Sequence, residues 1–331
     1  MTNDKPHWSD SDEKIGGYYG IRLMLLFYDY GGRIIFQIML YPVIFFYYLF
    51  SRKQRKISQD FLALVQRERA SKGLEPVHYS SFRHFLAFGT MLMDKINAWR
   101  GKLKLYRDIV FMEDAEKTIY AYEKEHRGRI LLCSHLGNVD ALRALIHGAK
   151  IKAPEIYSIF FTKNARNFNG LLKAVCKNAD MNIIATDAIG PATAIKLSEV
   201  IDNNGMIAIV GDRTPVRGHN ADHDGGPESL GQGPSRVCEV NFLGRKAKLP
   251  QGAFILAALL KCPMQCVFAL KNEKTNKIEI YCRNMFNEIK LPHKNKEETL
   301  KAYIQQYANI LEDYTLRYPY QWFNFFDFFS K

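Results

Sequence analysis

The chain has 331 residues, of which 47% are hydrophobic and 13% aromatic, so it is long enough to bury a substantial core. This composition excludes a disordered tail and a small disulfide scaffold, and a mean hydropathy of −0.23 leaves room for one membrane span but not for many. The formal net charge of +12 favours acidic partners such as nucleic acid, an anionic membrane surface or an acidic carrier protein. The six cysteines form no CxxC pair, so a reducing cytoplasm is the simplest compartment.

The first unusual segment is an uncharged run at positions 34–50, IIFQIMLYPVIFFYYLF, which Arg33 precedes and a basic cluster at 52–56 follows. The run is at the short end for a transmembrane helix, and it begins too late for an ordinary removable signal peptide. We therefore expect residues 1–56 to form an uncleaved membrane anchor, with the basic flank keeping the rest of the chain in the cytoplasm. A buried core helix kinked at Pro42 is the alternative.

Residues 57–126 carry apolar positions at three- and four-residue spacing and predict a helical region. Over 127–290, short β-branched runs alternate with helix-like stretches, and this predicts an α/β fold with a largely parallel central sheet flanked by helices. Residues 291–331 follow, with one closing helix predicted at 296–317. The Gly-rich stretch from Gly218 to Gly233 is expected to form a long loop.

The tail at 318–329, YPYQWFNFFDFF, holds eight aromatic residues in twelve positions. So many aromatic side chains have to be shielded from water by the protein or by lipid. The tail therefore packs onto the protein or dips into a bilayer interface, and the sequence leaves both open.

The first candidate for chemistry is a histidine with an aspartate five residues later. His135 ends the first predicted strand, and Asp140 lies in the first turn of the helix expected to begin near Asn138. Ligands of α/β folds bind outside the carboxyl ends of strands, and the turn between the two residues can bring carboxylate and imidazole together. The pair could then act as a general base; a helix-capping Asp140 with a structural His135 is the alternative.

Two further parts of the sequence are candidate anion-binding sites. Arg213 follows the strand GMIAIV, where it could hold a phosphate or carboxylate with Asp212 orienting it; a structural ion pair is the alternative. Arg245, Lys246 and Lys248 precede an apolar helix whose N-terminus favours anions, and a solvated basic loop is the alternative there.

Other chemistry has less support. The cluster of His219, Asp222, His223 and Asp224 contains metal-ligand residue types, but the surrounding glycines do not preorganise ligands, so we expect no metal. The sequence has no GxSxG motif, no P-loop and no GxGxxG fingerprint, and scattered basic residues without an aromatic–basic motif disfavour nucleic acid.

Taken in order, SHLGNVD, GMIAIVGDRTP, VNFLGRKAKLPQGAFILAALLKCPMQCVFAL and YPYQWFNFFDFF, preceded by an N-terminal apolar segment, resemble the lipid A late acyltransferase family. That family lies within the glycerolipid acyltransferase superfamily, and the resemblance covers nearly the whole chain. The long Gly/His/Asp-rich insertion after Arg213 and the tail are more similar to a divergent branch whose acceptor need not be lipid A.

The resemblance implies a bacterial inner-membrane enzyme whose catalytic part faces the cytoplasm. Such an enzyme moves a fatty acyl group from an acyl carrier protein thioester to a lipid or glycolipid acceptor without a metal or redox cofactor. The positive charge of the chain would also suit acyl-coenzyme A as donor, so charge alone leaves the donor open. It implies His135 as catalytic base, Asp140 as its partner and Arg213 as the basic position after the second core strand. Gly244 and Pro250 match the substrate-site turn of the family.

A thioester donor needs no enzyme nucleophile if His135 deprotonates the acceptor directly. The developing oxyanion needs a donor, and we expect the backbone N–H groups of Gly137 and Asn138, or the Arg213 side chain, to supply it. Arg245, Lys246 and Lys248 are expected to recruit an acidic carrier protein. The alternative function is not enzymatic: the chain would be a membrane-associated scaffold whose basic surface binds anionic lipid or nucleic acid.

Overall fold

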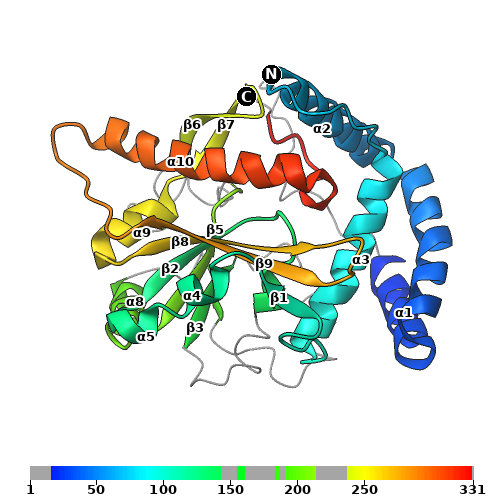
Figure 1. The fold of residues 1–331 in the computed structure, drawn as a ribbon, viewed down its shortest axis with the longest axis horizontal. Coiled ribbons are helices and arrows are strands. Elements are labelled where there is room, and N and C mark those ends of the chain that lie inside the picture. Colours follow the sequence, from blue (N-terminus) through cyan, green and yellow to red (C-terminus); the bar gives the residue numbers. More distant parts are fainter. Residues whose placement is uncertain (1–15, 143–154, 161–182, 186–190, 214–236, 330–331) are drawn as a thin grey trace, which may run out of the picture.

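The computed structural model describes residues 16–142, 155–160, 183–185, 191–213 and 237–329, and these residues surround a central sheet (Figure 1). The seven strands of this sheet follow the order β1-β9-β8-β2-β5-β3-β4. The pair β8–β9 is antiparallel and the other five neighbouring pairs are parallel. The predicted α/β fold with a largely parallel sheet flanked by helices is confirmed.

The strands of the central sheet are β1 (Ile109–Phe111), β2 (Arg129–Cys133), β3 (Ile156–Phe160), β4 (Ile183–Ala185), β5 (Met206–Val210), β8 (Met264–Lys271) and β9 (Ile278–Phe286). A separate antiparallel hairpin consists of β6 (Val237–Phe242) and β7 (Arg245–Pro250). The helices are α1 (Gly16–Phe50), α2 (Arg52–Ser71), α3 (Ser81–Trp99), α4 (Ala115–Ile119), α5 (Tyr122–Glu125), α8 (Pro191–Asp202), α9 (Gly252–Leu260) and α10 (Lys296–Arg317). Two short 3₁₀ turns are η2 (Val139–Leu142) and η4 (Pro319–Gln321).

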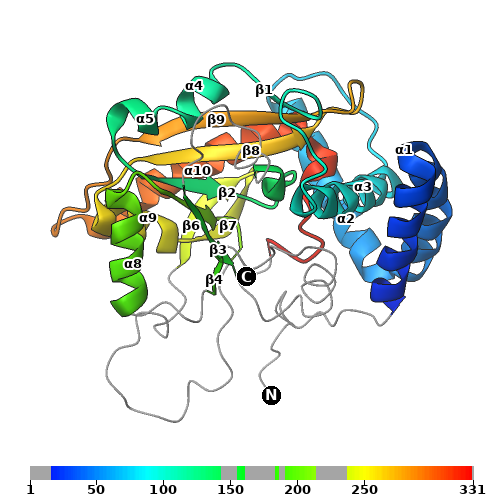
Figure 2. The same ribbon diagram turned by 90° about the horizontal axis from the view of Figure 1, so that it is seen from below.

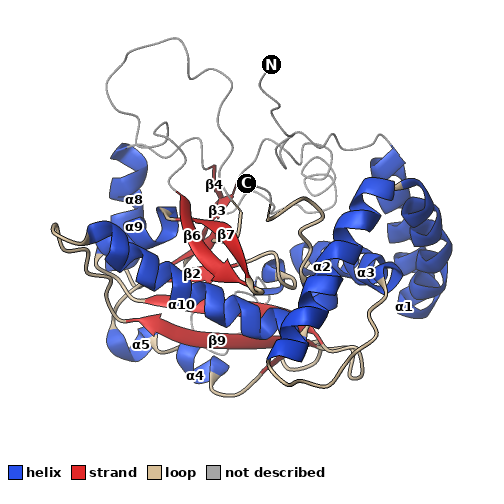
Figure 3. Ribbon diagram, turned by 90° about the horizontal axis from the view of Figure 1, so that it is seen from above, coloured by secondary structure: helices blue, strands red, loops and turns tan. Residues whose placement is uncertain are grey.

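The sheet is buried on both faces, which explains why β2 is apolar at nearly every position. Ile130 and Leu132 join the core cluster that contains Tyr307 of α10, whereas Leu131 and Cys133 join the cluster on the opposite face. Side chains of a strand alternate between the two faces of the sheet, so both faces need apolar residues when both are covered. Figures 1 and 3 show α10 running along one side of the sheet.

The N-terminal helix α1 has one packed side and one exposed side. It is long and apolar enough over Leu23–Phe50 to cross a membrane. Its interruption lies at Gly32, which has a non-helical φ of 67°, and Pro42 lies inside the helix. Leu40 and Ile44 are buried where a side chain on Gly89 of α3 would meet them.

The opposite side of α1 is apolar and uncovered. Ile34 is 74% exposed and Phe50 is 72% exposed, so the alternative of a helix buried in the core of this chain is wrong. The exposed large apolar residues of α1 are Leu23, Leu26, Tyr30, Ile34, Ile35, Ile38, Tyr41, Val43, Phe45, Phe46, Tyr47, Leu49 and Phe50. Helices α1 and α3 lie at one end of the molecule, away from α8 and α9 (Figure 2).

One prediction about local structure is wrong, and so is the alternative of a solvated loop for the basic residues. The region 57–126 is not wholly helical, because Ile109–Phe111 pairs with β9 as an edge strand. The basic residues Arg245, Lys246 and Lys248 lie on a strand rather than in a loop, because the two-residue turn Leu243–Gly244, with φ of 50° and 67°, closes a tight hairpin. The Gly218–Gly233 stretch, with His219, Asp222, His223 and Asp224, lies outside the described residues.

For the closing helix and the aromatic tail, the structure agrees with what the sequence analysis expected. The helix predicted at 296–317 is α10 with the same bounds. The tail packs back onto the protein: Trp322 is 1% exposed and Phe323 is 5% exposed, and Trp322 lies within ring contact of Phe61 and Phe242. Of the two alternatives for the tail, packing onto the protein is therefore the one observed.

Gly137 is expected to be nearly irreplaceable, because it has a φ of +81° and a Cβ there would lie 2.2 Å from the carbonyl oxygen of Ala269. Gly101, which has a φ of +65° and open space within 4 Å of the place that a Cβ would take, is the matched control. We expect Gly101→Ala to lower the free energy of unfolding by about 1–2 kcal/mol, the usual cost of a left-handed L-residue. Gly137→Ala should cost at least ~4 kcal/mol or prevent folding. Denaturant titration of the detergent-solubilised chain checks this, and equal losses would contradict it.

Candidate active site

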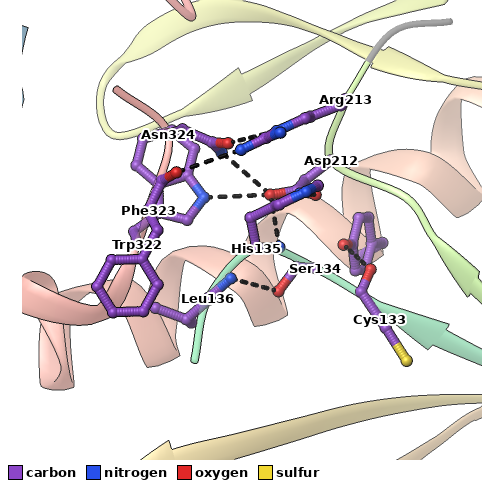
Figure 4. Close-up of polar contacts among 10 residues, drawn as sticks. Cys133, Ser134, His135, Leu136, Asp212, Arg213, Trp322, Phe323 and Asn324 are labelled. Atoms are coloured by element: carbon purple, nitrogen blue, oxygen red, sulfur yellow. Dashed lines mark hydrogen bonds and ion pairs between the residues drawn. The ribbon is translucent and has the colours of Figure 1, made fainter. Parts of the chain in front are cut away.

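The candidate site centres on an imidazole–carboxylate pair at the carboxyl ends of two neighbouring parallel strands. His135 follows β2 and Asp212 follows β5, and the register that pairs Cys133 with Val210 brings them together. The Nδ1 atom of His135 lies 2.8 Å from Oδ1 of Asp212, and the backbone N–H of His135 donates to Oδ2 at 3.0 Å (Figure 4). The carboxylate therefore fixes both the imidazole and the backbone from which it extends.

The hydrogen-bond network also assigns the tautomer of His135. An ionised carboxylate only accepts hydrogen bonds, so Nδ1 carries the proton and Nε2 presents its lone pair. Among the described residues, no hydrogen bond reaches Nε2. The His135 side chain is 31% exposed, so the imidazole is reached by solvent.

Burial is the largest influence on the His135 pKa and lowers it, and the nearby charge of Arg213 lowers it further. Asp212 opposes both effects through its charge and its hydrogen bond, but the net pKa stays below the ordinary value of about 6.5. The imidazole is therefore neutral at pH 7, which is the form a general base requires.

Asp212 is fully buried, and both of its oxygens accept hydrogen bonds. Burial acts to raise its pKa, but the charge and hydrogen bond of His135, together with Arg213, outweigh that effect and bring the pKa to about 2. Oδ2 also accepts from Nε1 of Trp322 at 3.3 Å and from Nδ2 of Asn324 at 3.1 Å. The carboxylate is ionised at every physiological pH, and two of its donors come from the C-terminal tail.

Asp140 does not have the place that the sequence predicted. Its oxygens contact Nε1 of Trp99 at 2.9 Å and Nζ of Lys95 at 3.0 Å, both in α3. The chain after Asn138 forms the 3₁₀ turn η2, which packs against α3, where the Asp140 carboxylate finds these partners. The carboxylate bonded to His135 is Asp212, for which the sequence predicted only a role in orienting Arg213.

The expected oxyanion donors in the backbone are already used. The N–H of Gly137 donates to the carbonyl of Gln321 and the N–H of Asn138 donates to the carbonyl of Ala269, both at 2.8 Å. The side chain of Asn138, in contrast, is 6% exposed, and neither of its amide atoms has a hydrogen-bond partner in the part of the chain that the structure describes. Its Nδ2 is therefore a donor that no described residue uses, unlike the two backbone N–H groups.

Arg213 lies beside the pair, as expected, but it is held by the tail. Its Nε donates to Oδ1 of Asn324 at 2.9 Å, and a terminal nitrogen donates to the carbonyl of Phe323 at 3.2 Å. The guanidinium also lies over the ring of Phe326, 5.5 Å from the centroid. Burial lowers its pKa to about 10, so it is still charged at pH 7.

The three basic residues of β7 lie outside this network and are exposed. Arg245 lies over the ring of Phe329, 5.2 Å from the centroid, and Lys246 Nζ is 3.8 Å from a carboxylate oxygen of Glu239. Because Phe242 at the end of β6 contacts Trp322, the hairpin and the site share the tail as a neighbour. The structure thus places these cations near the site but not in contact with His135.

Trp322 and Asn324 are site residues that the sequence analysis missed. The tail's density of aromatic residues signalled burial, but nothing in a single sequence connects position 324 with position 212. The only signal was the presence of polar residues, Gln321 and Asn324, within a run that has to be covered. A buried polar side chain needs a partner, and the partners are found only in the fold.

A comparison with models of protein families and a comparison with curated proteins each return no match.

Exchanging each aspartate for asparagine should separate the partner of His135 from the other carboxylate. We expect Asp212→Asn to lower the His135 pKa by about one unit or more, because it removes the adjacent opposite charge. Asp140→Asn should give a smaller fall, because Asp140 contacts Lys95 and Trp99 instead. NMR titration of the ¹⁵N-histidine-labelled full chain in detergent measures both, with the His135 signal identified by its loss in His135→Gln. A larger fall in Asp140→Asn would contradict the assignment.

Proposed function

We propose that this chain is a membrane-associated acyltransferase that moves a fatty acyl group from a thioester donor to a hydroxyl or amine of a lipid or glycolipid acceptor. The observation that carries the proposal is the His135–Asp212 pair: a neutral, partly exposed imidazole whose Nδ1 is held by a buried carboxylate and whose Nε2 has no partner among the described residues. This is the arrangement that a general base needs.

In the proposed reaction, Nε2 of His135 takes the proton of the acceptor hydroxyl or amine as its oxygen or nitrogen attacks the thioester carbonyl. Asp212 stabilises the imidazolium that forms. Collapse of the tetrahedral intermediate breaks the carbon–sulfur bond, and the thiolate leaves with the proton that Nε2 returns. The ester or amide and the free thiol are the products, and no enzyme side chain is acylated.

The neighbouring serine supports direct transfer rather than an acyl-enzyme. Ser134 is 3% exposed, and its Oγ accepts a hydrogen bond from the backbone N–H of Leu136 at 3.2 Å. A nucleophilic serine needs to be within hydrogen-bond reach of its base and open to the substrate. Ser134 instead stabilises the turn that carries His135 (Figure 4).

The tetrahedral oxyanion requires a donor, and the side chains of Asn138 and Arg213 are the candidates that the site offers. The Asn138 amide is buried without a partner among the described residues, three positions after His135. Arg213 is charged and close enough to lower the His135 pKa. A donor fixed in a dry site stabilises developing negative charge at little reorganisation cost.

The exposed apolar side of α1 supports a membrane location. Next to it, the N-terminal residues of α2 include exposed Arg52, Lys53 and Lys56, which favour an anionic lipid surface. Apolar area in contact with lipid and cations near the headgroups act together. The proposal places the enzyme at the cytoplasmic face of a bacterial inner membrane, as the family resemblance implies.

The exposed cations of β7 support an acidic donor. An acyl carrier protein and coenzyme A are both anionic, and opposite surface charges raise the encounter rate. Lys246 and Lys248 share the exposed face of β7, and Arg245 is exposed at the beginning of the strand, where it lies over Phe329; we propose that the acidic surface of a carrier protein meets these cations. We propose the carrier protein as donor, and supplying each thioester in turn decides between them.

We expect His135→Ala to reduce acyl transfer by about 10²–10⁴-fold, because this is the usual contribution of a general base. Ser134→Ala is the matched control, and its turnover should stay within a few fold of the parent because the hydroxyl takes no part in the reaction. The assay supplies acyl-carrier thioester and bacterial lipid extract and detects the product by mass spectrometry. Near-normal turnover of His135→Ala, or a parent that consumes no thioester, would contradict the proposal.

The same assay has an expected pH dependence. The neutral imidazole is the active form, so activity is present above the folded-state pKa of His135 and is lost as the pH falls through it. Because that pKa is lowered, the acid limb of kcat/KM should have its midpoint below about 6.5. A midpoint above this value would contradict the assignment of His135 as base.

Replacing Ile34, Ile38 and Phe46 together by serine should release the protein from membranes, because these exposed residues of α1 are the proposed lipid contacts. Serine at Ile195 and Leu259, which are 63% and 70% exposed on other helices, is the control and should leave the protein bound. Sedimentation of washed membranes measures the bound fraction. Equal retention of both variants would show that this side of α1 does not hold the protein on the membrane.

A further inference from the structure

The side chain of Asn324 lies between the two charged residues that follow β5. Its Nδ2 donates to Oδ2 of Asp212 at 3.1 Å, and its Oδ1 accepts from Nε of Arg213 at 2.9 Å. Because a carboxylate only accepts and a guanidinium only donates, these two partners fix the orientation of the amide. Asn324 is 5% exposed, so water does not compete at this position.

Asp212 and Arg213 carry opposite charges and are adjacent in the chain, yet they do not pair directly. The donors that reach Asp212 within the described residues are His135, Trp322 and Asn324. A guanidinium beside a buried carboxylate usually forms a direct and often bidentate contact. The Asn324 amide occupies the place of that contact.

We propose that Asn324 is a positioning residue that keeps the Arg213 guanidinium off the Asp212 carboxylate, so that Asp212 serves His135 while Arg213 is held for an anion. A catalytic role for Asn324 rests on the proposed function, in which His135 is the base. The arrangement itself is a property of the folded chain. An asparagine is suited to it because its amide both donates and accepts at the same position.

The position of Arg213 relative to Asp212 affects the pKa of His135. The largest charge effects on this imidazole come from Asp212 and Arg213 after β5 and from Lys95 of α3, which is itself paired with Asp140. Tyr307 of α10 lies near Asp212 but is neutral, because burial raises its pKa. If Arg213 paired with Asp212, it would screen the negative charge that stabilises the imidazolium, and the His135 pKa would fall.

Asn324→Leu tests this, because leucine is close in size and can neither donate nor accept. Arg213 is expected to move onto Asp212, and the His135 pKa should fall by about one unit. The decisive comparison adds Arg213→Met to each background. Since Arg213 lowers the His135 pKa, its removal should raise that pKa, and the rise should be larger when residue 324 is leucine than in the parent. Phe325→Leu, in the next position of the tail, should leave the His135 pKa unchanged.

The measurement is the ¹⁵N-histidine titration of the full chain in detergent, which requires no substrate. An equal or smaller effect of Arg213→Met in the leucine background overturns the proposal. Should Asn324→Leu not fold, Asn324→Asp decides instead: it keeps the acceptor for Arg213 but adds a negative charge near His135, so the His135 pKa should rise, and no rise overturns the proposal. A confirmed pKa pattern in a protein that transfers no acyl group would leave this inference standing and remove the proposed function.

Discussion

The buried charge of Asp212 is the constraint on which the site depends. An ionised carboxylate without partners in a protein interior would cost several kcal/mol, which is a large part of the stability of a typical domain. Its two oxygens are satisfied by His135, by the indole of Trp322 and by the amide of Asn324. These donors come from the end of β2 and from the C-terminal tail, so one charge holds together segments that are far apart in the chain.

This constraint explains why the tail crosses the turn after β2. The N–H of Gly137 donates to the carbonyl of Gln321, and the N–H of Phe323 donates to the carbonyl of His135 at 3.0 Å. The side-chain amide of Gln321 bonds both the N–H and the carbonyl of Lys271 at the end of β8. The tail thus bonds the backbone of the turn after β2 and of the end of β8, and these contacts place Trp322 and Asn324 within reach of Asp212.

The sequence predicted the elements in which apolar residues recur at a regular spacing, and it missed the elements in which they do not. The closing helix was predicted with its observed bounds because apolar residues recur along all 22 residues of α10. Strand β1 has three residues and one fully buried position, which is too short for a period. Strand β7 alternates exposed Lys246 and Lys248 with buried Ala247 and Leu249, but the charges dominate the pattern when the partner strand is not known.

The sequence located only part of the site, because only part of the site gives a local signal in the sequence. A single sequence locates His135, because the end of an apolar strand is a local feature. The partner of His135 is not local: Asp140 is near in sequence, whereas Asp212 is near only because β2 and β5 pair in parallel. Asn324 is further still, and its role depends on the path of a tail that has no periodic pattern. Spacing rules therefore favoured the wrong carboxylate.

Helix α3 connects the exposed apolar helix to the site. On one side it packs against α1 at Gly89, and on the other its Lys95 and Trp99 hold Asp140. His84 of the same helix contacts the tail: burial lowers its pKa to about 4, so it is neutral, and its Nε2 donates to the carbonyl of Trp322 at 3.2 Å. Helix α3 thus contacts both the exposed apolar helix and the tail residue that donates to Asp212. The buried carboxylate, the tail that satisfies it and the helix that packs against α1 therefore belong to one continuous set of contacts.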